Sequence, residues 1–287
     1  MYGLRTLLLP VRKLCSNLSK ATELVGIQHL EGKHAGIAVI SMSRRKHKNA
    51  INDEFVNLLQ EVLDSVKFNE KLRALILKSN VPGTFCAGAD LKYRATLPAE
   101  EIASASQKIK RVSTELKTFP VPVIAAIDGL ALGGGLELAL GCDMRVAAKD
   151  VSLGQPETTL ALIPGAGGTQ NLPRLIGEAK AKEMIFCDRR LSGEEAEKIG
   201  LVNYAVDQND SGDAAYQKSL RIAEQILSKA PLAVKMAKKA INNGLNVDLN
   251  TGLVIETACY AQIIPTEDRL EGLRAFIEKR TPEYKGK

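Results

Sequence analysis

Short apolar runs alternate with segments of helical periodicity through the first two thirds of the chain. The runs at 36–42, 74–77, 123–127 and 144–147 contain almost no polar residue. Between the first two, apolar residues recur at helical spacing over 55–66. Unbroken apolar runs of this length are typical of strands buried on both faces, and intervening helices are typical of parallel sheets. The sequence therefore predicts an α/β fold built around a parallel sheet.

The last third of the chain is predicted to be mainly helical. Helices are also predicted earlier in the chain, at 98–117, at 134–141 and from near Thr169. A capping box at Ser192–Glu195 predicts the start of a further helix. Helices are then expected at 213–228, 231–243, 247–261 and 266–279. We expect a β/α core over 23–205 and a helical C-terminal region over 206–287, packed on the core or on a partner.

The first 22 residues differ from the remainder in charge. They hold four basic residues and no acid, so the net charge of +6 falls to +2 for the rest of the chain (6 − 4). Leucines lie among the basic residues and serines follow, a composition typical of a mitochondrial transit peptide. The sequence predicts delivery to the mitochondrial matrix with cleavage before Leu24; the alternative is a plain cationic N-terminus. No segment is predicted to span a membrane.

Two glutamates, Glu137 and Glu157, each follow or precede a glycine-rich segment in apolar surroundings. Desolvation raises a carboxyl pKa, so one acid of a close pair can hold a proton while the other stays ionised. Such a pair can activate a water, and glycine backbone N–H groups can stabilise an oxyanion. The alternatives are a structural Glu137 paired with a buried arginine and an ordinary loop acid at Glu157.

Other common site types are not indicated. The glycine-rich run at 165–168 is followed by no Lys-Ser/Thr pair, and the dinucleotide spacing fails at Gln170, which excludes both nucleotide motifs. This run is either a tight helix start or part of a ligand cavity. The five cysteines form no CxxC pair, and the three histidines all lie before residue 48, so no zinc site is expected.

Three motifs together resemble those of the crotonase (enoyl-CoA hydratase/isomerase) superfamily. They are CAGADL at 86–91, GLALGGGLELA at 129–139, and QPE at 155–157 with IPGAGGTQ at 163–170. The resemblance extends over 36–285, and the segment AQIIPTEDRLEG at 261–272 is similar to the methylglutaconyl-CoA hydratase branch. It implies a repeated ββα spiral core with a helical C-terminal trimerisation region, and a dimer of trimers.

The resemblance also implies a complete site for an acyl-CoA thioester. Glu137 would act as base toward a water, Glu157 would exchange the proton at the α-carbon, and the N–H groups of Ala89 and Gly134 would hold the thioester oxygen. No metal or redox cofactor is implied. The residues implied to bind the substrate, the last two across a trimer interface, are Lys48, Ala50, Ala87, Gly88, Asp90, Leu91, Gly133, Phe276 and Lys279.

Several functions stay open at this point. The resemblance favours hydration of methylglutaconyl-CoA in leucine degradation, whereas Gln155-Pro156 is similar to the general short-chain hydratases of fatty-acid β-oxidation. Some members of the branch bind AU-rich RNA, which would require a basic surface. The cations considered for it, whose alternatives are a solvated helix face or contacts to coenzyme A phosphates, are Lys92, Arg94, Lys108, Lys110, Arg111 and Lys117. A scaffold without activity is disfavoured because both acids are retained.

Overall fold

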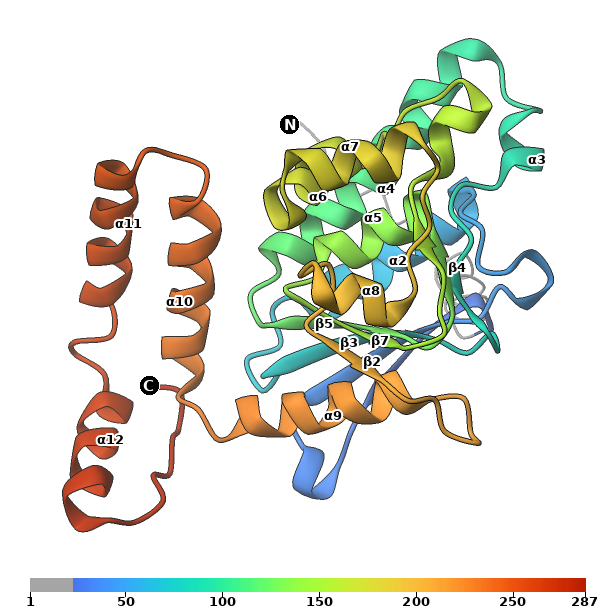
Figure 1. Cartoon of the computed structure of the whole chain (residues 1–287). Helices are drawn as coiled ribbons and strands as arrows, with labels where there is room; N and C mark the ends of the chain where they lie inside the picture. The colour runs from blue at the N-terminus through green and yellow to red at the C-terminus, as the bar shows by residue number, and fades with distance from the viewer. Residues whose placement is uncertain (1–22) are drawn as a thin grey trace, which may run out of the picture.

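A six-stranded sheet forms the centre of the computed structural model, which describes residues 23–287 (Figure 1). Its strand order is β1-β2-β3-β5-β7-β9, with β1 antiparallel to β2 and all other neighbours parallel. The strands are β1 (Val25–His29), β2 (Ile37–Met42), β3 (Ala74–Ser79), β5 (Val123–Ile127), β7 (Met144–Ala148) and β9 (Tyr204–Val206). The predicted α/β class and the four predicted strands are confirmed.

The central strands contain few polar residues because helices cover both faces of the sheet. Alternate residues of β2, β3, β5 and β7 point to α9 (Ala214–Leu227), which packs on one face through Ala215, Ile222 and Ala223. The other residues of these strands point to the larger core that α2 (Asp53–Val66) and α4 (Ala99–Thr118) complete. The sequence boundary at 205 assigns α9 to the C-terminal region, whereas its side chains belong to the core.

A second, smaller parallel sheet positions the candidate site. It contains β4 (Thr84–Cys86), β6 (Leu130–Leu132) and β8 (Leu153–Gly154) in that order. Each of its strands comes directly before one of the three sequence motifs or lies within it. The sheet thus sets the loop after β4, the glycine run after β6 and the acid after β8 beside one another.

Six shorter helical segments connect the strands or surround the second sheet. They are η1 (Gly32–His34), η2 (Arg45–His47), α3 (Leu91–Arg94), α5 (Gly134–Gly141), η3 (Pro156–Leu160) and α6 (Gly168–Ile176). Two more, α7 (Glu178–Phe186) and α8 (Gly193–Lys198), follow α6. The capping predictions are confirmed: the Asn52 side chain accepts from the Phe55 N–H, and Ser192 and Glu195 form the full capping box.

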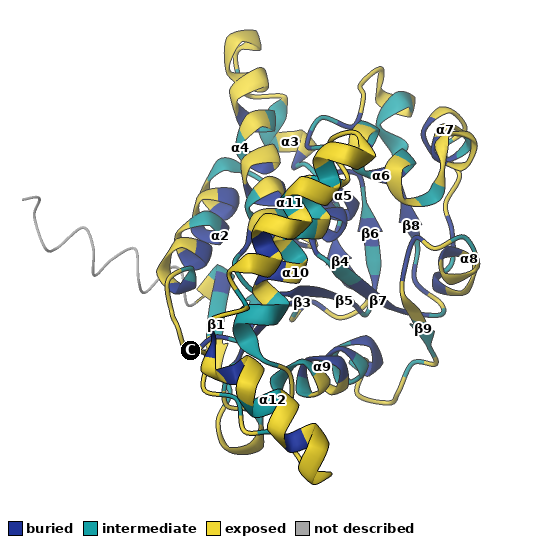
Figure 2. Cartoon of the chain, turned by 90° about the vertical axis from the view of Figure 1, so that its left-hand side faces the viewer, coloured by how far each residue is buried: buried dark blue, intermediate teal, exposed yellow. Residues whose placement is uncertain are grey.

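Three C-terminal helices lie to one side of the core in Figure 1, and α10 and α11 lie in front of it in Figure 2. They are α10 (Pro231–Gly244), α11 (Leu249–Ala261) and α12 (Glu267–Glu278), close to the bounds expected from the sequence. Most of their surface is exposed in the single chain (Figure 2). The exposed apolar residues of this region are Ile241, Leu245, Val247, Leu249, Leu253, Val254, Tyr260, Ile264, Leu270, Leu273, Phe276 and Ile277.

The sequence also predicted a transit peptide and the absence of a membrane-spanning segment. The predicted transit peptide, residues 1–22, lies outside the described residues. Among residues 23–287, every helix is too short or too polar to traverse a lipid bilayer.

Candidate active site

Glu137 is held inside the protein by main-chain donors. It lies one turn into α5, is only 3% exposed, and its Oε1 accepts hydrogen bonds from the N–H groups of Ala166 and Gly168, each at 2.7 Å. The Ser113 hydroxyl of α4 donates to the Glu137 carbonyl at 2.9 Å, which fixes the helix that carries the acid. The suggested arginine partner is wrong for the described chain, because the carboxylate bonds to backbone amides instead.

Two glycines leave the space that these contacts require. A side-chain carbon at Gly168 would lie 2.9 Å from Glu137 Oε1, and one at Gly133 would lie 3.0 Å from Glu157 Oε1. Gly167, with φ of 112°, and Gly133, with φ of 52°, form the N-caps of α6 and α5 in conformations that favour glycine. The run at 165–168 is therefore both a tight helix start and a wall of the site.

Glu157 approaches the same position from the opposite motif. It lies in η3, directly after β8, and is half-buried. The Thr158 hydroxyl next to it donates to the Ile185 carbonyl of α7 at 2.6 Å and anchors the turn. Gln155 is fully buried, and with its amide nitrogen assigned to the side that faces Glu157 it donates to both carboxylate oxygens, each at 3.0 Å. The structure thus brings the two predicted acids to one site.

The two acids differ in electrostatic environment. Burial first, and then the charge of Glu137, together raise the pKa of Glu157 to about 7. Burial also raises the pKa of Glu137, but the Gly168 and Ala166 N–H groups oppose that shift because they stabilise the ionised form. When the pair holds a single proton near neutral pH, that proton is therefore on Glu157, and Glu137 is ionised.

Two unpaired N–H groups lie beside the acids. A side-chain carbon at Gly134 would lie 3.7 Å from the Ala89 nitrogen, and one at Gly88 would lie 3.4 Å from the Gly134 nitrogen. Within the described chain, neither the Ala89 nor the Gly134 N–H donates to a protein acceptor. Gly134 is also the first residue of α5, where the helix dipole adds positive potential. The arrangement suits a developing oxyanion.

The loop after β2 holds the Ala89 segment in place. Ile51 N–H donates to the Gly88 carbonyl at 2.7 Å, and Asp90 N–H donates to the Ile51 carbonyl at 2.9 Å. Asn49, fully buried, donates to the Phe85 carbonyl at 2.9 Å and to the Ser79 hydroxyl at 2.8 Å. These bonds fix the backbone on either side of Ala89, whose own N–H donates to no acceptor in the described chain.

Of the residues implied to bind the substrate, most lie in these loops. Ala87 N–H donates to the Lys48 carbonyl at 3.0 Å, and Ala50 accepts from Arg44 at 2.7 Å. The Asp90 carboxylate already accepts from Arg44 at 2.7 Å and caps α3 at Tyr93, so its visible role is structural. The other predicted substrate-binding residues in the loops beside the acids are Gly88, Leu91 and Gly133.

Phe276 and Lys279 lie elsewhere. Phe276 is in α12 and Lys279 follows it, on the side of the molecule opposite α3 in both views (Figures 1 and 2). Phe276 is 83% exposed. A single chain does not bring these two residues to the acids, so their implied role requires a second chain and stays a prediction.

The sequence reasoning missed three kinds of group. The N–H donors of Ala166 and Gly168 lie in the glycine-rich motif at 163–170, but the sequence spacing does not reveal that they bind Glu137. Gln155 was noted only as a family feature, although its side chain is the direct partner of Glu157. Arg94 was considered only as a surface cation, whereas its charge acts on the pKa of both acids.

Two of the six cations considered for RNA already have protein partners. Lys108 pairs with Asp53, and Lys117 donates to Asn171 at 3.1 Å. Lys110 and Arg111 are exposed but neighbouring positions of a helix point about 100° apart. RNA binding stays a prediction.

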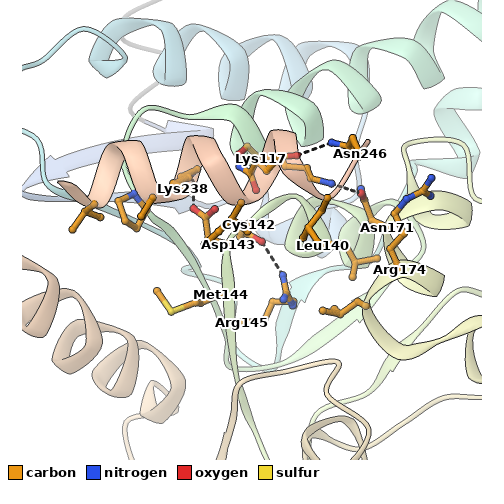
Figure 3. A pocket seen from close by; sticks show the side chains of 17 residues that line it. Lys117, Leu140, Cys142, Asp143, Met144, Arg145, Asn171, Arg174, Lys238 and Asn246 are labelled. Atoms are coloured by element: carbon orange, nitrogen blue, oxygen red, sulfur yellow. Dashed lines mark hydrogen bonds and ion pairs between the residues drawn. The ribbon is translucent and has the colours of Figure 1, made fainter. Parts of the chain in front are cut away.

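A pocket of about 660 Å³ lies apart from the acids (Figure 3). It separates α10 from the C-terminal ends of α4, α5 and α6, and none of its lining residues is a predicted site residue. Its buried charges are internally paired: Lys238 contacts Asp143 at 2.6 Å, and Arg145 donates to the Cys142 carbonyl at 2.8 Å. Lys238, a residue of α10, thus ties this helix to the core, and Arg145 binds carbonyls at the C-terminal end of α5. Among residues 23–287 no cluster of three metal-ligating side chains occurs.

Comparison with known proteins agrees with this geometry. The sequence profile of the enoyl-CoA hydratase/isomerase family matches residues 32–287. The mitochondrial methylglutaconyl-CoA hydratase of Homo sapiens is 52% identical over 96% of this chain and 81% of its own length. The mitochondrial enoyl-CoA hydratase domain-containing protein 2 of Homo sapiens is 51% identical over 92% of this chain and 90% of its own.

Solved structures share the fold as well. The crystal structure of an enoyl-CoA hydratase from Bacillus anthracis is 46% identical and superposes with a TM-score of 0.87. It covers 92% of this chain and 99% of its own.

Proposed function

Because the chain belongs to the enoyl-CoA hydratase/isomerase family, we propose that Glu137 and Glu157 add water reversibly to the double bond of a short-chain 2-enoyl-CoA. The observation that carries this proposal is the unequal acid pair. Glu157, with a pKa raised to about 7, holds a proton beside an ionised Glu137. Hydration needs one group that takes a proton and one that gives a proton, and this pair supplies both.

The proposed reaction begins with the thioester oxygen between the N–H groups of Ala89 and Gly134. This contact draws electron density from the double bond and stabilises the enolate that forms. Glu137 takes a proton from water, whose oxygen bonds to the β-carbon. Glu157 gives its proton to the α-carbon, and the enolate returns to a thioester. Both acids lie on one side of the substrate, so the addition is syn.

We propose that this chemistry needs neither a metal ion nor a redox cofactor. Addition of water leaves the overall oxidation state of the substrate unchanged. Two acids account for both protons that move, and two amides account for the negative charge that develops. Coenzyme A enters only as part of the substrate.

Methylglutaconyl-CoA is the substrate that we propose, which would place the enzyme in leucine degradation. Relatives of this name are 51–52% identical over 96% of the chain. The second candidate, a general short-chain enoyl-CoA of fatty-acid β-oxidation, is supported by relatives named only as enoyl-CoA hydratases, such as one from Arabidopsis thaliana at 44% identity. The two differ in the acyl group beyond the double bond.

We also propose a trimer, or a dimer of trimers, in the mitochondrial matrix. The C-terminal helices expose twelve large apolar side chains in the single chain, more than an isolated soluble surface commonly leaves uncovered. A second chain of the same kind would cover them and would bring Phe276 and Lys279 near a neighbouring site. The location is supported by the relatives named as mitochondrial.

A direct turnover comparison tests the proposed function. Purified protein is given crotonyl-CoA and methylglutaconyl-CoA, and loss of enoyl-thioester absorbance is followed. We expect hydration of both, with a higher kcat/KM for methylglutaconyl-CoA. Absence of turnover with both substrates would refute the hydratase proposal, and a preference for crotonyl-CoA would refute the proposed substrate.

A further inference from the structure

We propose that Arg94 binds a second carboxylate, at the far end of the acyl group, and makes the enzyme selective for dicarboxylic acyl-CoA thioesters. This inference rests on the proposed function and assigns one residue to substrate choice. It concerns the part of the substrate that neither the acids nor the amides touch.

The backbone places Arg94 next to the reacting groups. It is the last residue of α3, a single turn that Asp90 caps directly after Ala89. Arg94 N–H donates to the Asp90 carbonyl at 2.8 Å, and Asp90 is itself fixed by Ile51 and Arg44. One turn of helix advances about 5.4 Å, so Arg94 is held within a short distance of the amide proposed to bind the thioester oxygen.

Arg94 is half-buried, and no hydrogen bond or ion pair joins its guanidinium to the protein among residues 23–287. The neighbouring cations are already used: Arg44 pairs with Asp90, and Lys108 pairs with Asp53. A partly desolvated arginine without a carboxylate is costly to maintain unless a ligand supplies one. This unpaired charge is the observation that points to an anionic ligand.

The charges around the acids agree with this position. Arg94 lowers the pKa of both Glu137 and Glu157, which places its charge near each of them. Lys110 also acts on Glu137, and Asp188 acts on Glu157 in the opposite direction. Lys110 is exposed, so water screens its charge more strongly than that of Arg94. Arg94 is therefore the cation whose charge acts on the pKa of both glutamates.

The chemistry of a dicarboxylic substrate explains why such a cation is needed. The methylglutaconyl group is a five-carbon diacid chain with a methyl branch, and the carbon of its free carboxylate lies two bonds beyond the β-carbon. Bound for reaction, it would therefore lie close to the ionised Glu137 and would be repelled. An arginine can bind this carboxylate through two parallel N–H donors and cancel the repulsion. An uncharged four-carbon tail would gain nothing from it.

Binding of unreactive thioesters tests the inference without turnover. Glutaryl-CoA and pentanoyl-CoA have acyl groups of five carbons, and only the first ends in a carboxylate. Calorimetry on the wild type is expected to show at least tenfold tighter binding of glutaryl-CoA. Arg94→Met should weaken glutaryl-CoA binding about 10- to 100-fold, as expected for a hydrogen-bonded charge, and pentanoyl-CoA binding less than threefold. Arg94→Lys should fall between, because the charge remains and the two-pronged geometry is lost.

Arg221→Met is the matched control. Arg221 is an exposed cation on α9, at the opposite face of the central sheet, and its replacement removes the same charge. It should leave the binding ratio unchanged. Equal binding of the two thioesters by the wild type would overturn the inference. So would equal weakening of both by Arg94→Met, which would show a general effect on the site.

The experiments can refute the hydratase proposal and the Arg94 proposal independently of each other. If the wild type hydrates neither crotonyl-CoA nor methylglutaconyl-CoA but prefers glutaryl-CoA in an Arg94-dependent manner, the reaction is wrong and the carboxylate site is right. If it hydrates crotonyl-CoA and shows no preference between the saturated thioesters, the reaction is right and the role of Arg94 is wrong.

Discussion

Replacing Gly134 by alanine should remove activity while leaving the fold intact. An added side-chain carbon would lie 3.5 Å from the Ile51 Cδ1 atom, 3.7 Å from the Ala89 nitrogen and 3.8 Å from the Gly88 Cα atom. These are ordinary van der Waals distances, so nothing in the protein must shift. The methyl group would nevertheless occupy space next to the two free N–H groups, where we place the thioester oxygen.

This geometry sets the expected change in kcat/KM and in the melting temperature of Gly134→Ala. Alanine keeps the backbone N–H, but its methyl group would displace the thioester oxygen from this donor; loss of one oxyanion contact costs about 2.7 to 4 kcal/mol of transition-state stabilisation, so kcat/KM should fall about 100- to 1000-fold. Gly134 is the first residue of α5, and alanine is favoured over glycine in helices by up to about 1 kcal/mol. The melting temperature should therefore be unchanged or slightly higher.

Gly135→Ala provides the matched control one residue further along the helix. There the added carbon would lie 2.2 Å from the Cys86 carbonyl oxygen, so the backbone must move and the protein should lose at least about 1 to 3 kcal/mol of stability. Hydration of crotonyl-CoA and thermal unfolding are measured for both variants. Wild-type turnover in Gly134→Ala would refute the placement of the thioester oxygen in the space beside Gly134.

Four further predictions follow from the same contacts. The active pair carries one proton, and the pKa of Glu157 is about 7, so kcat/KM should fall about tenfold per pH unit above that value; a flat profile from pH 7 to 9 would contradict this. Because the folded-state pKa of Glu157 is raised, its ionisation costs stability as pH rises from about 4.5 to about 7. Glu157→Gln should therefore be more stable than the wild type at pH 8 by ~1 kcal/mol, after screening of this half-buried group, and equal at pH 4, as read from urea unfolding at each pH. Asn49→Ala strands the buried Phe85 carbonyl and should cost about 2 to 3 kcal/mol in urea unfolding; a loss below 0.5 kcal/mol would count against its role. Leu253→Lys, on the exposed face of α11, should lower the mass measured by light scattering from three or six chains to one without loss of helical circular dichroism, and a monomeric wild type would contradict the proposed assembly.

The parts of the fold that the sequence predicted are those with strong periodicity. The strands β2, β3, β5 and β7 are buried on both faces, and their apolar runs are continuous. The helices α10 to α12 start at clear signals: Pro231 at the first position of α10, and the caps Asp248 and Thr266, whose side chains accept from N–H groups of the next turn. Such local signals need no knowledge of tertiary contacts.

The second sheet escaped prediction because its strands are too short. β8 contains two residues and β4 and β6 contain three each, which is less than one full alternation of a half-buried strand. β1 was missed for another reason: it is an edge strand of mixed polarity, and its pairing with β2 is antiparallel in an otherwise parallel sheet. Pairing partners of this kind depend on tertiary structure.

The two acids were predictable, but the groups that make them unequal were not. Glycine-rich flanks and apolar neighbours mark Glu137 and Glu157 in the sequence. The donors to Glu137 lie 29 and 31 residues away along the chain, at Ala166 and Gly168, and no local pattern connects them. The role of Arg94 likewise depends on the turn that follows the Ala89 loop.

Turnover by Glu137→Gln and Glu157→Gln tests the central claim most directly. Glutamine preserves the shape of each side chain and removes its ability to exchange a proton. Each variant should keep the wild-type circular dichroism spectrum and a cooperative unfolding transition, and should hydrate crotonyl-CoA at least about 100-fold more slowly, the lower range for general acid–base catalysis. Turnover near the wild-type rate in either variant would contradict the two-acid mechanism.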